Sequence, residues 1–319
     1  MSRPPKPALP MRDGVSASAL ACPAGPWPAL LDFIAERLPL VTRADWAARM
    51  DGGEVLDEQA RPLAAATPYR AGQRIYYYRR LAQEHEIPFR EEILFRDEHL
   101  LVADKPHFLP VTPKGRYVQQ TLLTRLKRAT GLADLVPVHR IDRETAGLVV
   151  FALRPQDRDA YQRLFRERSV EKVYEAIAPA PERATRQDLT LPVLYRSRLR
   201  ECAEAFMQMQ EVAGEPNAET AIALLERLGG GLARYELRPS TGQKHQLRAQ
   251  LSALGLPILG DRIYPQLLPA ETQPDHDQPL RLLAREIAFT DPLDGSARRF
   301  LSRRTLPAPE QAEDAPAPR

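Results

Sequence analysis

Apolar positions recur every three or four residues between residues 30 and 50, which predicts two short amphipathic helices. Two glycines at 52–53 end the second helix. The pattern then alternates loosely and finishes at 75–78 in an isoleucine followed by three tyrosines, a composition typical of a strand. This stretch therefore predicts a small α+β unit, two helices followed by a hairpin.

From residue 91 onward the pattern predicts strands and helices in mixed order. Two short strands flank Asp97-Glu98, a helix at 121–130 ends at Gly131, and the apolar run at 148–152 is typical of a strand covered on both faces. The later predicted elements are a helix at 156–168, an alternating strand at 170–177, a hairpin of strands at 220–228 and 232–238, and a helix at 241–255 that Thr241 caps and Gly255 follows.

Low-complexity ends and one connector divide the chain. Residues 1–28 repeat Pro, Ala and Ser, and the end of the chain is rich in Pro, Ala and acids, so both ends are expected to be disordered. The expected order is a leader at 1–28, a first domain at 29–80, a linker at 81–90, a larger domain at 91–302 and a tail at 303–319.

Composition narrows the class of protein only slightly. The chain has 319 residues, 43% of them hydrophobic, which suits a folded two-domain protein. Lys and Arg number 45 against 42 Asp and Glu, and the pI is about 8.9. This mildly basic balance permits a nucleic-acid partner without requiring one.

Several classes of site are not expected. The two cysteines, Cys22 and Cys202, support neither a disulfide framework nor a cysteine metal site, and the six histidines never occur at zinc-ligand spacing. We therefore expect no metal and a reducing, cytoplasmic location. The N-terminus lacks an apolar signal region, and no apolar run approaches about 18 residues, so neither secretion nor membrane insertion is predicted.

The densest group of charges lies directly before the buried strand at 148–152. Asp142 stands between Arg140 and Arg143, where nearby positive charge favours the ionised carboxylate. Gly147 permits a close turn into the strand. A fixed, ionised aspartate is a nucleophile or a base, although an ordinary solvated turn of ion pairs has the same composition.

The order of residues in this cluster favours the catalytic interpretation. His139-Arg140-Ile141-Asp142, followed by Thr145-Ala146-Gly147, resembles the His-Arg-Leu-Asp-x-x-Thr-Ser-Gly signature of the RluA family of RNA pseudouridine synthases, with Asp142 at the catalytic aspartate. Ala146 replaces the usual Ser. The protein-kinase loop also contains His-Arg-Asp, but Ile141 interrupts it here and no glycine-rich ATP loop is present.

Further motifs of the same family occur in the family's order, one before the signature and the others after it. The segment ending at Lys105-Pro106 resembles the family's first motif, although Phe108 replaces a Gly and Thr112 a His. Lys172-x-Tyr174-x-Ala176 resembles the second, which implies that Tyr174 contacts the target base. Residues 241–248, with Gln243 in place of an Arg, and residues 257–264 resemble the last motifs, which implies that Arg248 pairs with the catalytic aspartate.

Other basic residues near these motifs are expected to contact RNA. Lys244 and His245 are expected in the first turn of the 241–255 helix, where backbone N–H groups and positive charge attract a phosphate. The full set of expected RNA contacts is Arg140, Arg143, Lys172, Lys244 and His245.

Residues 29–80 resemble the S4 RNA-binding domain that often precedes this synthase domain. Thr42-Arg43, Gly53, Val55, Gly72 and Ile75 occupy fitting positions. However, acidic residues at 57–58 replace the usual Asn-Gly turn, and like charge there weakens phosphate binding. The alternative is a small α+β domain that packs on the enzyme without touching RNA.

The resemblance implies an α+β fold, in which a mixed, largely antiparallel sheet is flanked by helices behind the small S4-like domain. It implies isomerisation of uridine in RNA without a cofactor, most readily in 23S rRNA, with tRNA as the alternative. A monomer is the default expectation. A non-catalytic RNA-binding or RNA-folding protein on the same scaffold is a second hypothesis. A third is a hydrolase that pairs Asp142 with a second acid, either Glu144 or Asp261.

Overall fold

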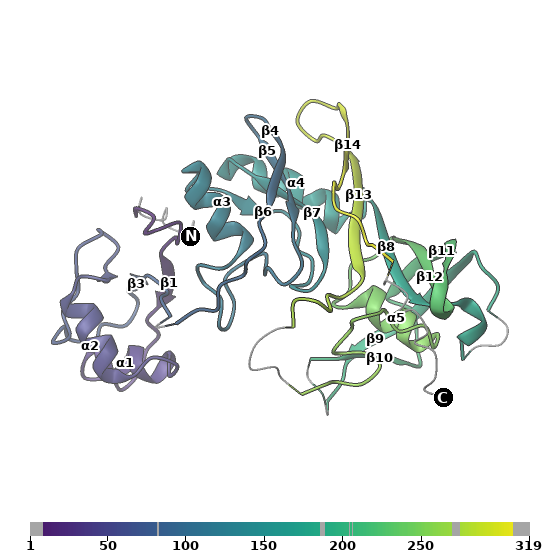
Figure 1. Cartoon of the computed structure of the whole chain (residues 1–319). Coiled ribbons are helices and arrows are strands. Elements are labelled where there is room, and N and C mark those ends of the chain that lie inside the picture. The colour runs from purple at the N-terminus through teal and green to yellow at the C-terminus, as the bar shows by residue number, and fades with distance from the viewer. Residues whose placement is uncertain are drawn as a thin grey trace, which may run out of the picture. The chain divides into compact units, whose positions relative to one another are not determined.

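The computed structural model describes residues 9–308, except residues 82, 186–188, 204, 206 and 270–274. The chain divides into two compact units (Figure 1). The first unit comprises residues 1–85 and 112–133, and the second comprises residues 86–111 and 134–319. Each unit has its own core and is described separately.

The first unit contains the predicted helices and strand. Helix α1 spans Leu30–Arg37 and helix α2 spans Arg43–Asp51, and the Thr42 side chain caps α2 by accepting from the amide of Asp45. Strands β1 (Ser18–Ala21), β3 (Arg74–Tyr77) and β2 (Val55–Leu56) form an antiparallel sheet in that order. The buried side chains of Leu30, Phe33, Ile34, Trp46, Met50 and Ile75 form much of the core.

Two features of this unit differ from the prediction. Strand β1 lies inside the segment predicted as a disordered leader, so residues 18–21 are part of the fold. Helix α3 (Leu122–Thr130) was assigned to the larger domain but groups with the first unit. The helix itself matches the prediction, since Thr121 caps its start and Gly131 adopts the left-handed conformation at its end.

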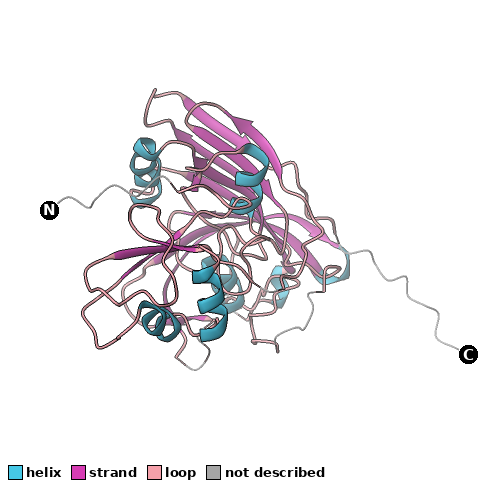
Figure 2. Cartoon of the chain, turned by 90° about the vertical axis from the view of Figure 1, so that its left-hand side faces the viewer, coloured by secondary structure: helices cyan, strands magenta, loops and turns pink. Residues whose placement is uncertain are grey.

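The described part of the second unit is built on an 11-stranded sheet (Figure 2). Along the sheet the order is β10-β9-β11-β12-β8-β13-β7-β5-β4, while β14 pairs with β13 and β6 with β7. Only the β13–β7 pair is parallel among these strands, so the sheet is mixed and largely antiparallel, as predicted. The strands are β4 (Glu92–Arg96), β5 (Leu100–Lys105), β6 (Val136–Pro137), β7 (Ala146–Ala152), β8 (Glu171–Pro179), β9 (Val193–Glu201), β10 (Met209–Val212), β11 (Ala218–Leu228), β12 (Leu232–Pro239), β13 (Leu282–Thr290) and β14 (Ala297–Leu301).

Two helices of this unit pack against the sheet at separate clusters. Helix α4 (Arg158–Arg166) buries Tyr161 among side chains of β5, β7 and β13. Helix α5 (Gln246–Ala253) packs Leu247 and Leu251 against β8, β11 and β12. Short 3-10 turns occur at Pro155–Asp157, Pro181–Arg183 and Gly229–Gly231. Asp142 lies in the segment directly before β7, which is an interior strand of the sheet between β13 and β5.

The chain end also differs from the prediction. Leu306 is buried beside Ala146 and Ile177, and Arg304 donates to the backbone carbonyl of Asp104. Residues 303–306, predicted as tail, thus contact the rest of the fold, whereas 309–319 lie outside the described residues.

Candidate active site

The loop at 138–145, which carries Asp142, is fastened to the buried strand β7. The His139 ring accepts a hydrogen bond from the amide of Val150 at 3.1 Å and stacks on Phe165 with 4.5 Å between ring centroids. Burial, helped by the charge of Lys172, lowers the pKa of His139 to about 3. The ring is therefore neutral near pH 7, as an acceptor nitrogen requires.

A second set of contacts fixes the same loop from the side of β5. Lys105 is completely buried and donates to the carbonyls of Pro106 and Arg143, each at 2.9 Å. Burial lowers the pKa of Lys105 to about 7, although the charges of Glu144 and Asp142 oppose this shift. His107 donates to the Glu144 carbonyl at 2.6 Å. The loop is thus held on both sides of Asp142, by the His139 ring before it and at the carbonyls of Arg143 and Glu144 after it.

Arg248 joins two carboxylates. Its Nε and Nη2 donate to the two oxygens of Asp261 at 2.8 and 2.7 Å, and its Nη1 donates to Oδ2 of Asp142 at 3.1 Å. The side chains of Arg248 and Asp261 are 1% and 0% exposed, whereas that of Asp142 is 28% exposed. The fork–fork pair with Asp261 fixes the guanidinium, which then presents one N–H to the accessible carboxylate.

The charge on Arg248 is secure despite its burial. Burial alone would lower the pKa of this guanidinium, but the hydrogen bonds and charge of Asp261, together with the charge of Asp142, raise it above its ordinary value. Asp142 therefore faces a permanent cation. The predicted pairing of Arg248 with Asp142 is present in the structure.

Asp261 and Tyr264 complete this group. The sequence offered Asp261 only as a possible second acid of a hydrolase, and it did not select Tyr264. Asp261 also accepts from the amides of Ile263 and Tyr264, at 2.8 and 3.1 Å, so the chain wraps around its carboxylate. The Tyr264 hydroxyl accepts from the amide of Met209 at 2.6 Å, and its ring lies 5.6 Å from the Arg248 guanidinium carbon. Both residues lie within the motif at 257–264, and this motif is the feature of the sequence that could have identified them.

The start of helix α5 differs from the prediction. His245 is the N-cap residue, in the left-handed conformation with a φ of 53°, so the helix begins at Gln246 and neither Lys244 nor His245 lies in its first turn. The Thr241 hydroxyl donates to the Gln246 side chain at 2.7 Å instead of capping the helix. Lys244 pairs with Glu201 at 3.0 Å.

This altered start places His245 at the site. Its Nε2 lies 3.8 Å from Oδ1 of Asp142, and its Nδ1 lies 3.4 Å from the Tyr264 hydroxyl. Burial lowers the pKa of His245, although the neighbouring Asp142 charge opposes the shift. His245 is therefore closer to the chemistry than its predicted role as an RNA contact implied.

Tyr174 lies on β8, between β12 and β13. Burial, with the charge of Asp142 adding to it, raises the pKa of the Tyr174 hydroxyl above its ordinary value, so the ring is neutral. Lys172, two residues earlier, donates to the Thr241 carbonyl at 3.1 Å and so holds the loop before α5. Burial, with the charge of Arg168, lowers the pKa of Lys172.

The two arginines that flank Asp142 in the sequence have different surroundings. Arg143 binds Glu144 at 2.7 Å, and Arg140 is exposed without an ion pair or hydrogen bond to another described residue. That these arginines favour the ionised form of Asp142 stays a prediction, and the structure adds an ion pair at 3.1 Å between Asp142 and Arg248.

The two carboxylates considered as the second acid of a hydrolase, Glu144 and Asp261, are both bound by arginines. Burial alone would raise the pKa of Glu144, but the charges of Arg143 and Arg248 and a hydrogen bond from Arg143 lower it, so Glu144 is an anion rather than an acid. Asp261 is held by two N–H groups of Arg248. Neither residue suits the second acid that this hypothesis requires.

Among the described residues, no group of three or more His, Cys, Asp or Glu side chains is arranged to hold a metal ion. None of the described helices combines the length and the apolar character that a membrane crossing requires.

Comparisons with known proteins all point to the same class of protein. A family model described as RNA pseudouridylate synthase matches residues 99–253. An uncharacterised RNA pseudouridine synthase of Synechocystis sp. is 30% identical over 74% of this chain and 79% of that protein. The dual-specificity RNA pseudouridine synthase RluA of Haemophilus influenzae is 32% identical over 66% of this chain and 91% of that protein. The solved structure of human RNA pseudouridylate synthase domain containing 1 covers 70% of this chain and 86% of its own at 24% identity, with a TM-score of 0.54, which shows a shared fold.

Proposed function

Because this chain belongs to the RluA family of RNA pseudouridine synthases, we propose that Asp142 is the residue with which it isomerises uridine in RNA. The reaction breaks the N1–C1′ bond and joins C5 to C1′ of the same nucleotide. Atoms and oxidation state are conserved, so the chemistry consumes no second substrate. C5 must release a proton after the new bond forms, and N1 must gain one.

The proposal rests on the difference in exposure between the two carboxylates that Arg248 binds. A buried guanidinium, fixed by the fully buried Asp261, holds one oxygen of the partly exposed Asp142. An anion fixed in this way is pre-organised as the nucleophile or base that the reaction requires. Arg248 positions it, and Tyr174 is the platform for a uracil withdrawn from its stack.

The remaining basic residues form the RNA contacts in this proposal. Arg140 is exposed and unpaired among the described residues, which suits a phosphate or the space that the flipped nucleotide leaves. Lys172, Lys244 and His245 surround the start of α5, and Arg143 follows Asp142. The substrate is structured RNA, 23S rRNA first and tRNA as the alternative, and the enzyme acts as a cytoplasmic monomer.

Replacement of Asp142 tests the proposal directly. Asp142→Asn keeps the size of the side chain but removes its charge and basicity, so pseudouridine formation should fall by roughly 10²-fold or more. Carbodiimide-dependent reverse-transcription stops on total RNA from wild-type, deletion and Asp142→Asn cells would map the modified position and show whether its stop disappears in both mutants.

Asp134→Asn is the matched control, because it removes a carboxylate that only forms an exposed pair with Arg158. Its cells should show the wild-type stops. Stops that vanish in the deletion strain yet persist in Asp142→Asn cells would contradict the role of Asp142.

A further inference from the structure

Positive charge is unevenly divided between the two units. The first unit carries 16 Lys and Arg against 9 Asp and Glu, a net charge of +7. The second unit carries 29 against 33, a net charge of −4, although it holds the catalytic group. Residues 112–133 contribute five basic residues and no acidic one. An RNA backbone is therefore attracted mainly to the first unit.

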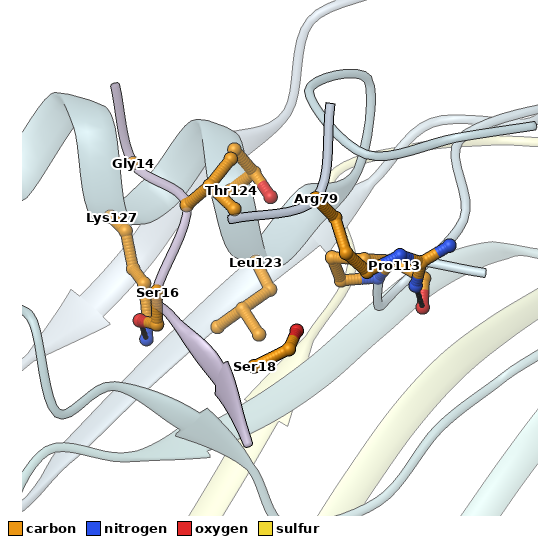
Figure 3. A pocket seen from close by; sticks show the side chains of 9 residues that line it. Gly14, Ser16, Ser18, Arg79, Pro113, Leu123, Thr124 and Lys127 are labelled. Atoms are coloured by element: carbon orange, nitrogen blue, oxygen red, sulfur yellow. Dashed lines mark hydrogen bonds between the residues drawn. The ribbon is translucent and has the colours of Figure 1, made fainter. Parts of the chain in front are cut away.

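A pocket of about 210 Å³ opens within this unit, between the segment before β1 and helix α3 (Figure 3). Lys127 and Arg79 flank it from two sides, and Leu123 and Ser18 lie between them. Its lining residues are Gly14, Val15, Ser16, Ser18, Arg79, Pro113, Leu123, Thr124 and Lys127, which include two cations, three hydroxyl side chains and no carboxylate.

Hydrogen bonds to a hydroxyl group and to backbone carbonyls orient the two cations. Lys127 is 6% exposed and donates to the Ser16 hydroxyl at 2.8 Å and to the Ala133 carbonyl. Arg79 donates to the carbonyls of Pro113 and Gly115 at 3.2 and 3.4 Å. A guanidinium has five N–H donors, so Arg79 retains donors beyond these two bonds. These contacts orient both side chains, and none of the residues that line the pocket is a carboxylate.

We propose that this pocket binds a backbone phosphate of the RNA substrate. Fixed cations, hydroxyl groups and an absence of lining carboxylates suit a phosphate, which offers charge-assisted acceptor oxygens. The inference rests on the proposed function, because it takes RNA as the ligand. It gives the first unit an RNA contact that does not depend on the acidic turn at 57–58, where an S4 domain would contact RNA.

A charge introduced inside the pocket tests the proposal. The Ser18 hydroxyl makes no hydrogen bond to another described residue, so Ser18→Asp removes no contact and adds a carboxylate beside the expected phosphate. Ala19→Asp is the matched control, because it makes the same change one residue along β1, on the exposed and opposite face of the strand. Affinity for RNA from cells that lack the gene should fall about tenfold more in Ser18→Asp than in Ala19→Asp.

Arg79→Gln provides a second measurement. It should lower the slope of log affinity against log salt concentration by about 0.7–0.9, the contribution of one phosphate contact. Arg37→Gln removes an exposed charge from α1 of the same unit and should leave the slope unchanged. Thermal unfolding of each variant separates lost contacts from lost folding.

The outcomes distinguish this inference from the proposed function. Asp142→Asn should abolish pseudouridine and keep the wild-type affinity and salt slope, whereas Ser18→Asp should raise KM and keep kcat. Equal affinities for Ser18→Asp and Ala19→Asp, in a protein that forms pseudouridine, would overturn the phosphate site alone. Absence of pseudouridine in every RNA fraction would overturn the function itself.

Discussion

Arg248 binds the buried carboxylate of Asp261 and the partly exposed carboxylate of Asp142. Its removal should therefore lower stability through Asp261 and catalysis through Asp142. The Asp261 side chain is 0% exposed. The amides of Ile263 and Tyr264 donate to it, but Arg248 supplies the positive charge that compensates the carboxylate. A buried charge that loses its partner costs roughly 3–5 kcal/mol. Arg248→Met should therefore lower the free energy of unfolding, measured in urea, by about that amount, and should also abolish pseudouridine formation.

A double variant separates the two effects. Arg248→Met with Asp261→Leu leaves no uncompensated carboxylate and should recover part of the stability, since buried ion pairs are replaceable by apolar residues. It should not recover activity, because Asp142 still lacks its cation. Equal stability of the single and double variants would contradict the assigned role of Asp261.

The contacts of Arg248 explain which residues of the site could be predicted from the sequence and which could not. The motif resemblance placed Asp142, Tyr174 and Arg248, and the Asp142–Arg248 contact is present. Asp261 could not be selected, because it meets Arg248 beyond the end of the helix, where periodicity says nothing about contacts. Sequence proximity suggested Arg140 and Arg143 as the charges near Asp142, but it could not show that Arg143 binds Glu144.

The lowered pKa of His139 predicts that the free energy of unfolding depends on pH. The ordinary histidine pKa is near 6.5, but burial lowers that of folded His139 to about 3. Between these values the unfolded chain binds a proton that the native protein does not, so stability falls as pH falls, by up to about 1.4 kcal/mol per pH unit. His139→Gln lacks this proton and should show a correspondingly shallower loss.

Urea unfolding of the wild type and His139→Gln from about pH 7.5 to 4.5 measures this difference in slope. His107, whose pKa burial lowers to about 4, adds the same trend to both proteins, so only the difference is informative. Parallel curves would show that the His139 ring titrates normally in the folded protein.

At the level of elements, the parallel contact between β7 and β13 requires a residue without a side chain. Gly147 has a φ of +110° and pairs with Ala284, whose backbone oxygen would lie 2.2 Å from an added Cβ. Gly147→Ala must therefore separate the strands and displace the loop that precedes them, which carries Asp142. We expect a loss of at least about 3 kcal/mol in stability, as for other disrupted core positions.

Gly131→Ala is the control for backbone strain. Gly131 also has a positive φ, of +72°, but nothing lies within 4 Å of its added Cβ. It should cost only about 1 kcal/mol, the price of the left-handed conformation. Thermal unfolding compares the two variants, and similar losses would show that strain, rather than the close approach to Ala284, governs position 147.

The elements that the sequence predicted are those whose signal is local. Helix α3 has both caps in its own sequence, and β7 is apolar at every position. Strand β9 was missed because its buried face includes Ser197, which hydrogen-bonds Gln250 of α5, so the expected alternation of apolar residues is broken by a polar one. Strand β1 was missed because it lies in a segment rich in Ala and Ser, and only pairing with β3 fixes it.

In the molecule as a whole, the net positive charge lies in the first unit and Asp142 lies in the second. We therefore expect the substitutions that weaken RNA binding to differ from those that lower kcat. The turn at 113–117 carries Lys114 and Arg116, both exposed, while Asp142 lies in the negatively charged second unit. RNA affinity should therefore depend mainly on residues that make no contribution to kcat.

Paired substitutions test this separation at constant charge. Lys114→Gln/Arg116→Gln removes two exposed cations from the first unit, and Arg198→Gln/Arg200→Gln removes two exposed cations, without described ion pairs, from β9 of the second. The first variant should raise KM, lower the salt slope by about 0.7 for each lost single-strand phosphate contact and leave kcat unchanged. The second has the same net charge, so a purely global electrostatic attraction predicts identical losses in both. If their salt slopes are equal, RNA senses the total charge of the protein, and the first unit is not the surface that binds it.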